Sequence, residues 1–176
     1  MKARIFWPKE VLFSPTANCN LLCEHCDIER RSTRLGKPTA FRFLAACAGA
    51  GIKRVGFTGG EPFLALDFVC AISKEAVRRG MFFSRVMTNG SWFGAKKGLT
   101  SALNRLLRAG YDGDLCLSVD GFHRQDLQKC ASFVRAATGI WRRSDIVSIA
   151  AVKGLREDHT HKRLTKLARI LHARLI

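Results

Sequence analysis

The chain has 176 residues, of which 47% are hydrophobic, so it can form the core of a folded domain and is not a disordered segment. Lysine and arginine number 30 against 14 aspartates and glutamates, and the resulting charge of +16 favours acidic partners such as RNA, DNA, an acidic peptide or a phosphorylated cofactor. Apolar runs stay short of the roughly 18 residues that a membrane span needs, and residues 1–8 form no hydrophobic signal region. We expect a globular domain without membrane contact.

Three closely spaced cysteines lie near the start of the chain. Cys19, Cys23 and Cys26 form the pattern C-x3-C-x2-C. Thiolates at this spacing can hold three irons of a cubane iron–sulfur cluster and leave the fourth iron open to another ligand. Alternatively, His25 could complete a structural zinc site with them, or the three could be unrelated core residues. The spacing alone leaves these alternatives open.

The other four cysteines stand singly in apolar patterns, and we expect them to be small core residues. They are Cys47, Cys70, Cys116 and Cys130. Because seven cysteines occur without an export signal, we expect the protein to work in the reducing cytoplasm.

Short β-like runs recur about every 30 residues beyond the cysteines, at 55–58, 82–88, 115–119 and 146–152. Helical apolar faces alternate with these runs. Their residues are Phe68, Val69, Ile72, Ala76 and Val77, then Leu99, Leu103, Leu106 and Leu107, then Phe133, Val134 and Ala137, and finally Leu164, Leu167, Ile170 and Leu171. The alternation predicts parallel strands joined by right-handed crossovers.

Residues with special backbone preferences predict where the helices begin and end. Pro38 suits the first turn of the first helix. Gly80, Gly110 and Gly139 suit the ends of later helices.

Polar segments follow three of the β-like runs and should meet at one edge of the sheet, where the carboxyl ends of parallel strands lie. They are Thr58-Gly59-Gly60-Glu61-Pro62, Thr88-Asn89-Gly90 and Ser118-Val119-Asp120-Gly121. Each can also be local structure: the first two as turns, and Ser118 or Asp120 as the cap of a helix that starts near Gly121. We expect His123 to be exposed in the first turn of that helix.

In this order, the cysteine triad and the three polar segments resemble the radical S-adenosylmethionine (radical SAM) superfamily, from about Val11 to about Lys153. The resemblance implies an α/β fold, a partial (β/α) TIM-like barrel of about five to six units. It implies an enzyme with a [4Fe-4S] cluster on Cys19, Cys23 and Cys26, whose open iron binds S-adenosylmethionine. An external one-electron donor would drive reductive cleavage to a 5′-deoxyadenosyl radical, which abstracts hydrogen from the substrate.

The resemblance also implies roles for residues that contact S-adenosylmethionine. His25 would lie beside the adenine, and Glu61 would be a charged partner of the methionyl amino group. Ser118 and Asp120 would bind the ribose hydroxyls. The full set of expected cofactor-binding residues is His25, Gly59, Gly60, Glu61, Pro62, Thr88, Asn89, Ser118 and Asp120.

The end of the chain predicts an open sheet. The family core has six units, and the spacing would let a sixth strand begin at 173–176 and finish beyond residue 176. We expect one domain over 1–176, without a separate auxiliary-cluster domain. The strand that ends near Val152 would then be an exposed edge, where a dimer mate or a partner chain could pair.

The substrate has no motif of its own. A peptide or protein is the first hypothesis, and a small molecule is another. RNA, favoured by the +16 charge, is the alternative substrate. A hypothesis of another class is a non-catalytic metal-binding module or a shortened relative.

Overall fold

The computed structural model describes residues 7–151, 165, 168–169 and 174–175. Strands and helices alternate along the chain, and a short 3₁₀ helix, η1, precedes α2. In chain order the elements are β1 (Glu10–Phe13), α1 (Lys37–Gly49), β2 (Arg54–Phe57), η1 (Pro62–Ala65), α2 (Leu66–Arg78), β3 (Phe82–Thr88), α3 (Lys96–Arg108), β4 (Asp114–Ser118), α4 (Leu127–Trp141), β5 (Val147–Ala150) and β6 (Arg174–Leu175). Among these described elements, no helix is both long and apolar enough to cross a bilayer.

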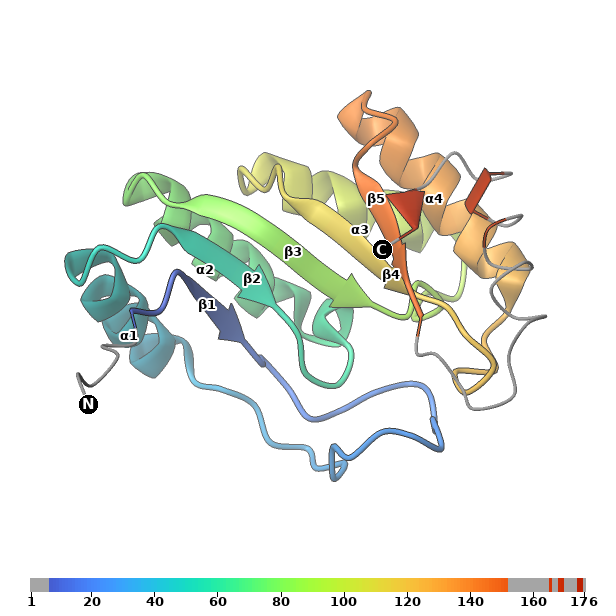
Figure 1. Ribbon diagram of the computed structural model, residues 1–176, viewed down its shortest axis with the longest axis horizontal. Helices are drawn as coiled ribbons and strands as arrows, with labels where there is room; N and C mark the ends of the chain where they lie inside the picture. Colours follow the sequence, from blue (N-terminus) through green and yellow to red (C-terminus); the bar gives the residue numbers. More distant parts are fainter. Residues whose placement is uncertain (1–6, 152–164, 166–167, 170–173, 176) are drawn as a thin grey trace, which may run out of the picture.

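The strands form one parallel sheet in the order β1-β2-β3-β4-β5-β6. The helices lie behind the sheet in Figure 1, and the strand arrows point toward the edge that the segment after β1 crosses. The predicted partial (β/α) barrel is therefore confirmed, as an open sheet with six strands. The described loops that follow β1, β2, β3 and β4 meet at this one edge.

The predicted strand positions agree closely with the structure. The run 82–88 matches β3 at both ends, and β2 and β4 each begin one residue earlier than predicted. The run 146–152 is too long at both ends, because β5 covers only Val147–Ala150. The sequence analysis gave no range for β1, which directly precedes the cysteine segment.

The core lies between the sheet and the helices, and the lone cysteines are part of it as predicted: Cys47, Cys70, Cys116 and Cys130 are all buried. The predicted helix faces are buried except for Val77 and Leu107, which are 50% and 37% exposed. Val77 instead lies on the flank of α2, next to Gly110. A Cβ added to Gly110 would stand 2.8 Å from Cγ2 of Val77. The last predicted face, Leu164 to Leu171, lies outside the described side chains.

The predicted helix ends are correct in three of four cases. Pro38 lies in the first turn of α1, and Gly80 and Gly110 have φ of 64° and 85° directly beyond α2 and α3. Gly139 does not end a helix, because α4 continues to Trp141. The Trp141 indole Nε1 donates to a backbone carbonyl 2.9 Å away, and this tertiary contact holds the last turn of α4.

The sixth strand begins where the spacing predicted it. β6 pairs in parallel with β5 through Ser148 and Ile149. The expectation that the strand ending near Val152 is an unpaired edge is therefore wrong, because β6 covers part of β5.

Candidate functional site

The segment between β1 and α1 crosses the carboxyl edge of the sheet and carries the three cysteines (Figure 1). Its two ends are held together at the base. Leu35 N donates to Pro15 O at 3.0 Å, and Thr16 forms an isolated antiparallel bridge with Arg34. The cysteines thus lie in a closed loop, which we call the cysteine loop (residues 17–33).

Gly59 and Gly60 let the cysteine loop lie directly against the segment after β2. Gly60 N donates to Thr16 O at 2.9 Å, and Glu61 N donates to Asn18 O at 2.8 Å. A Cβ at position 60 would stand 2.2 Å from Asn18 O, and Gly59 has a φ of +113°. The contact with the cysteine loop is therefore sufficient reason for glycine at positions 59 and 60. Any contact of these two glycines with a ligand would be additional.

Glu61 is fully buried and is not among the residues that line the cleft described below. Its Oε1 accepts hydrogen bonds from Phe63 N (3.1 Å) and Thr88 Oγ1 (2.9 Å), and its Oε2 accepts one from Asn89 N (2.9 Å). Burial raises the pKa of Glu61 to about 7, although these three hydrogen bonds act to lower it. The carboxyl group ties η1 to the end of β3, and its contact with S-adenosylmethionine stays a prediction.

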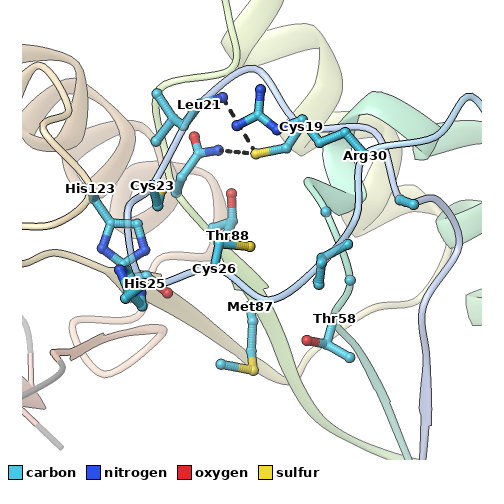
Figure 2. Close-up of a pocket in the computed structure, with 16 residues that line it drawn as sticks. Cys19, Leu21, Cys23, His25, Cys26, Arg30, Thr58, Met87, Thr88 and His123 are labelled. Carbon is cyan, nitrogen blue, oxygen red and sulfur yellow. Dashed lines mark hydrogen bonds between the residues drawn. The ribbon is translucent and has the colours of Figure 1, made fainter.

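A cleft of about 240 Å³ opens beside the docked cysteine loop, at the carboxyl ends of β2, β3 and β4. Figure 2 shows the side chains that surround it. They belong to Ala17, Cys19, Leu21, Cys23, His25, Cys26, Ile28, Arg30, Thr58, Gly59, Gly60, Met87, Thr88, Asn89, Ser118 and His123. The predicted site residues that do not line it are Glu61, Pro62 and Asp120.

The three cysteines of the loop are free thiols in different surroundings. Cys26 is exposed, whereas Cys19 and Cys23 are partly buried. Burial, and then the neighbouring Cys19 and Cys26, raise the pKa of the Cys23 thiol. Cys19 Sγ accepts hydrogen bonds from Leu21 N at 3.4 Å and from Asn89 Nδ2 at 3.7 Å (Figure 2).

The three free cysteines fit an iron–sulfur cluster, because each cysteine of a cubane binds a separate iron. His25, which could have completed a structural zinc site with them, instead has its ring beside Asp120 and His123. Cys19, Cys23 and Cys26 would hold the cluster, and the cleft beside them would hold S-adenosylmethionine.

Asp120 and His123 form a hydrogen-bonded pair at the wall of the cleft. Asp120, whose side chain is 1% exposed, accepts at Oδ1 from Phe122 N (3.0 Å) and His123 N (3.1 Å), and His123 Nδ1 lies 2.6 Å from the same oxygen. In the neutral ring, an ionised Asp120 favours the tautomer with the proton on Nδ1, which leaves Nε2 as an acceptor. The prediction of an exposed His123 is therefore wrong, because Asp120 holds the ring inward.

The predicted helix near Gly121 is also absent from the described chain at that position. Helix α4 begins at Leu127, and its cap is Asp126, whose side chain accepts from Gln128 N at 2.8 Å. The segment from Asp120 to Asp126 is a separate loop, which gives His123 its place on the cleft.

His25 lies against this pair. Its ring is 4.8 Å from the His123 ring and 5.2 Å from the Phe122 ring, centroid to centroid. The ligand atoms of His25, Asp120 and His123 all lie within 4.8 Å of one another, so the three could also contact a metal ion. Asp120 Oδ1 is already shared by three donors, which favours hydrogen bonding as the function of this pair.

Thr88, Asn89 and Ser118 line the cleft at the strand ends, as the sequence predicted. Thr88 Oγ1 accepts from Gly90 N at 3.1 Å, and Gly90 has a φ of 63°, so the segment is a turn as well as a wall of the cleft. Ser118 ends β4 and lines the cleft.

Residues of the site that were not predicted include Gln125, Met87 and Arg30. Gln125 Nε2 donates to Asn89 O at 3.1 Å and to Ser118 O, and so joins the loops after β3 and β4. Gln125 stands in a polar stretch that carries no signal for this contact. Met87 was detectable, since alternation along β3 places it on the face opposite Val86, which is buried in the core.

The Radical SAM superfamily model matches residues 13–166. Curated relatives include a GTP 3′,8-cyclase of Chlorobaculum tepidum, 30% identical over 65% of the chain, and a PqqA peptide cyclase of Methylorubrum extorquens, 30% identical over 73%. The chain spans only 34% and 33% of the lengths of these two proteins.

Solved structures with the same fold agree with this match. A histidine-tagged anSMEcpe with bound AdoMet superposes with a TM-score of 0.68 at 18% identity, over 94% of this chain and 50% of that one. Coproporphyrinogen III oxidase from Escherichia coli gives a TM-score of 0.59 at 18% identity, over 90% of this chain and 42% of that one.

Proposed function

We propose that this chain, which belongs to the radical SAM superfamily, holds its [4Fe-4S] cluster on Cys19, Cys23 and Cys26 and binds S-adenosylmethionine in the adjoining cleft. The observation that carries the proposal is the convergence of these three free cysteines with the ends of three parallel strands around one cleft. The structure brings together residues that lie up to about a hundred positions apart in the sequence.

When bound, the cluster and S-adenosylmethionine would supply, with one electron from an external donor, a 5′-deoxyadenosyl radical that removes a hydrogen atom from the substrate. The residues of the chain bind and orient. Gly59 and Gly60 offer backbone groups to the methionyl end, and Ser118 offers a hydroxyl to the ribose. His25 would offer a ring face to the adenine. Asp120 would act through His123, by orienting the ring so that Nε2 is available as an acceptor for the cofactor.

A peptide or protein is the substrate class that we favour. PqqA peptide cyclase of Methylorubrum extorquens is matched over 73% of the chain, compared with 65% for the GTP 3′,8-cyclase of Chlorobaculum tepidum. The second candidate is a nucleotide or RNA, favoured by the charge of +16 and by relatives named GTP 3′,8-cyclase. RNA binding would weaken steeply with added salt because phosphate contacts release counterions, whereas binding of a neutral peptide would not.

Anaerobic reconstitution tests the proposed site. We expect about four irons and four sulfides per chain, and with a reductant we expect 5′-deoxyadenosine and methionine from S-adenosylmethionine. Alanine at Cys19, Cys23 or Cys26 should remove the brown chromophore, whereas Cys47→Ala, in the core, should retain it. Stoichiometric zinc uptake without iron would contradict the proposal and support a metal-binding module.

We propose that residues 13–166, which the family model matches, form one catalytic domain. All seven cysteines are free in the structure, which supports the reducing cytoplasm as its location.

A further inference from the structure

We propose that the side-chain amide of Asn89 donates a hydrogen bond to the Cys19 thiolate and thereby raises the reduction potential of the cluster. The inference rests on the proposed function, because it requires the cluster on Cys19, Cys23 and Cys26. It assigns Asn89 a role in electron transfer to the cluster, in place of the general lining role predicted from the sequence.

The three cluster cysteines differ in the donors around their sulfurs. Cys19 Sγ accepts from Asn89 Nδ2 at 3.7 Å and from Leu21 N at 3.4 Å (Figure 2). Among the residues that the structure describes, no N–H group donates to the sulfur of Cys23 or Cys26. Asn89 is thus the side chain that distinguishes Cys19 from the other two cysteines.

The orientation of the Asn89 amide follows from its other hydrogen bonds. Its Oδ1 accepts from Ser91 N at 2.9 Å and from Ser91 Oγ at 3.1 Å. Its Nδ2 donates to Asn20 Oδ1 at 2.9 Å. A flipped amide would place its oxygen against Asn20 Oδ1 and its NH₂ against Ser91 N, so both contacts would be lost. The NH₂ group must therefore face Cys19.

The backbone of Asn89 is fixed as firmly as its side chain. Its N–H donates to Glu61 Oε2 at 2.9 Å, and its carbonyl oxygen accepts from Gln125 Nε2 at 3.1 Å. The residue is only 6% exposed. The donor is therefore held at the end of β3, independently of the cysteine loop that it contacts.

The direction of the effect follows from charge. Reduction adds an electron to the cluster and makes its sulfur ligands more negative. A hydrogen bond to a cysteine sulfur therefore stabilises the reduced cluster more than the oxidised one, and hydrogen bonds to the sulfurs are one determinant of cluster potential. The low exposure of Asn89 strengthens this interaction, because water screens its amide little. Loss of the Asn89 donor should shift the potential to a more negative value.

Redox titration of the reconstituted protein, followed by the EPR signal of the reduced cluster, tests the inference. Asn89→Ala should shift the potential to a more negative value, and Asn89→Asp should shift it further, because a carboxylate would then face the thiolate. The matched control is Asn20→Ala. It removes the hydrogen bond from Asn89 Nδ2 to Asn20 Oδ1 but leaves the Ser91 contacts that orient the Asn89 amide. Its potential should equal that of the unmodified protein.

Two results would overturn the inference: equal shifts in Asn89→Ala and Asn20→Ala, or no shift in either Asn89 variant. If the unmodified protein binds no cluster, it is instead the proposed function that fails.

A second measurement applies even if the Asn89 variants do not take up the cluster. Asparagine labelled with ¹⁵N only in the side chain can be incorporated into the Asn20→Ala protein, which keeps Asn89. Pulsed EPR of its reduced cluster should then detect a coupled ¹⁵N nucleus through the Nδ2–H···Sγ bond. Absence of that coupling would contradict the inference.

Discussion

The two sides of the site are built in opposite ways. On one side, Glu61, Thr88 and Asn89 are 0%, 2% and 6% exposed and bonded to one another. On the other side, the outer part of the cysteine loop is open, with Cys26 exposed and Leu22 84% exposed. The contrast indicates that the two sides have different functions. Glu61, Thr88 and Asn89 form a rigid framework at the strand ends, and the cysteine loop carries the groups that bind the cluster.

The largest effect is expected where the loop meets the framework. In Gly60→Ala the new Cβ would stand 2.2 Å from Asn18 O and 2.7 Å from Asn18 C, both backbone atoms that cannot rotate away. We expect the free energy of unfolding to fall by about 3 kcal/mol, at the upper end for overpacking, and the iron content after reconstitution to fall with it. Urea denaturation and iron analysis measure the two effects.

Gly94→Ala is the matched control for this substitution. Position 94 has no heavy atom within 4 Å of an added Cβ, so its stability and iron content should match those of the unmodified protein. An equally stable, fully loaded Gly60→Ala protein would mean that the loop does not depend on this contact.

The second prediction concerns the buried carboxyl group of the framework. Burial raises the pKa of Glu61 from its ordinary value of 4.5 to about 7, so the folded state binds this proton more tightly than the unfolded state. The resulting stability is fully present below about pH 4.5 and is lost as the pH rises toward 7. We expect a loss on the order of 3 kcal/mol across this window in the cluster-free protein.

Glu61→Gln identifies the part of this pH dependence that belongs to Glu61. The amide does not titrate, so its unfolding free energy should change less between pH 4.5 and 7 than that of the unmodified protein. The Glu61→Gln protein should also be less stable overall. Its new NH₂ group would replace one carboxylate oxygen and would then face an N–H or O–H donor, either Asn89 N or the donors that now bond to Oε1. Parallel pH profiles for the two proteins would show that Glu61 is ionised throughout.

The framework side was predictable in position but not in direction. Because the turn signal Thr88-Asn89-Gly90 begins at the last residue of β3, the sequence predicts both the end of this strand and the polar groups there. The direction of a side chain at such an end depends on what packs beside it. Glu61 and Asp120 were both predicted to face S-adenosylmethionine, yet both carboxyl groups accept hydrogen bonds from their own chain. A single sequence does not contain the tertiary contacts that decide this.

The same limit explains the errors in helix α4. Gly139 is a reasonable stop by local preference, but the contact of Trp141 with the carbonyl of Tyr111, 30 residues away, extends the helix. The start was misplaced because Asp120 and Asp126 are both plausible caps, and only the structure shows that Asp120 is occupied by His123. Periodicity located the buried face of this helix, whereas its ends depend on distant residues.

The third prediction examines the pair that borders the open side of the cleft. Asp120→Asn removes the negative charge that holds the proton on His123 Nδ1, so Nε2 is no longer a fixed acceptor. We expect S-adenosylmethionine to bind about tenfold more weakly to the reconstituted protein, which corresponds to about 1.4 kcal/mol. Asp126→Asn is the control, since it makes the same charge change at a helix cap that tolerates asparagine. Equal affinities in all three proteins would leave Asp120 as a turn residue only.

The smallest effect is expected in the outer part of the cysteine loop, where Glu24 pairs with Arg124 of the loop after β4. The two side chains are 61% and 74% exposed, so water and salt screen their attraction. Glu24→Gln should therefore lower the free energy of unfolding by no more than about 0.5 kcal/mol at low salt, and by less as salt is added. Glu29→Gln is the matched control, because Glu29 pairs with Arg31 at similar exposure but within the same loop. If Glu24→Gln destabilised the protein as much as a change in the buried framework, the outer loop would be held as firmly as the strand ends. The division between a rigid framework and an open binding loop would then be wrong.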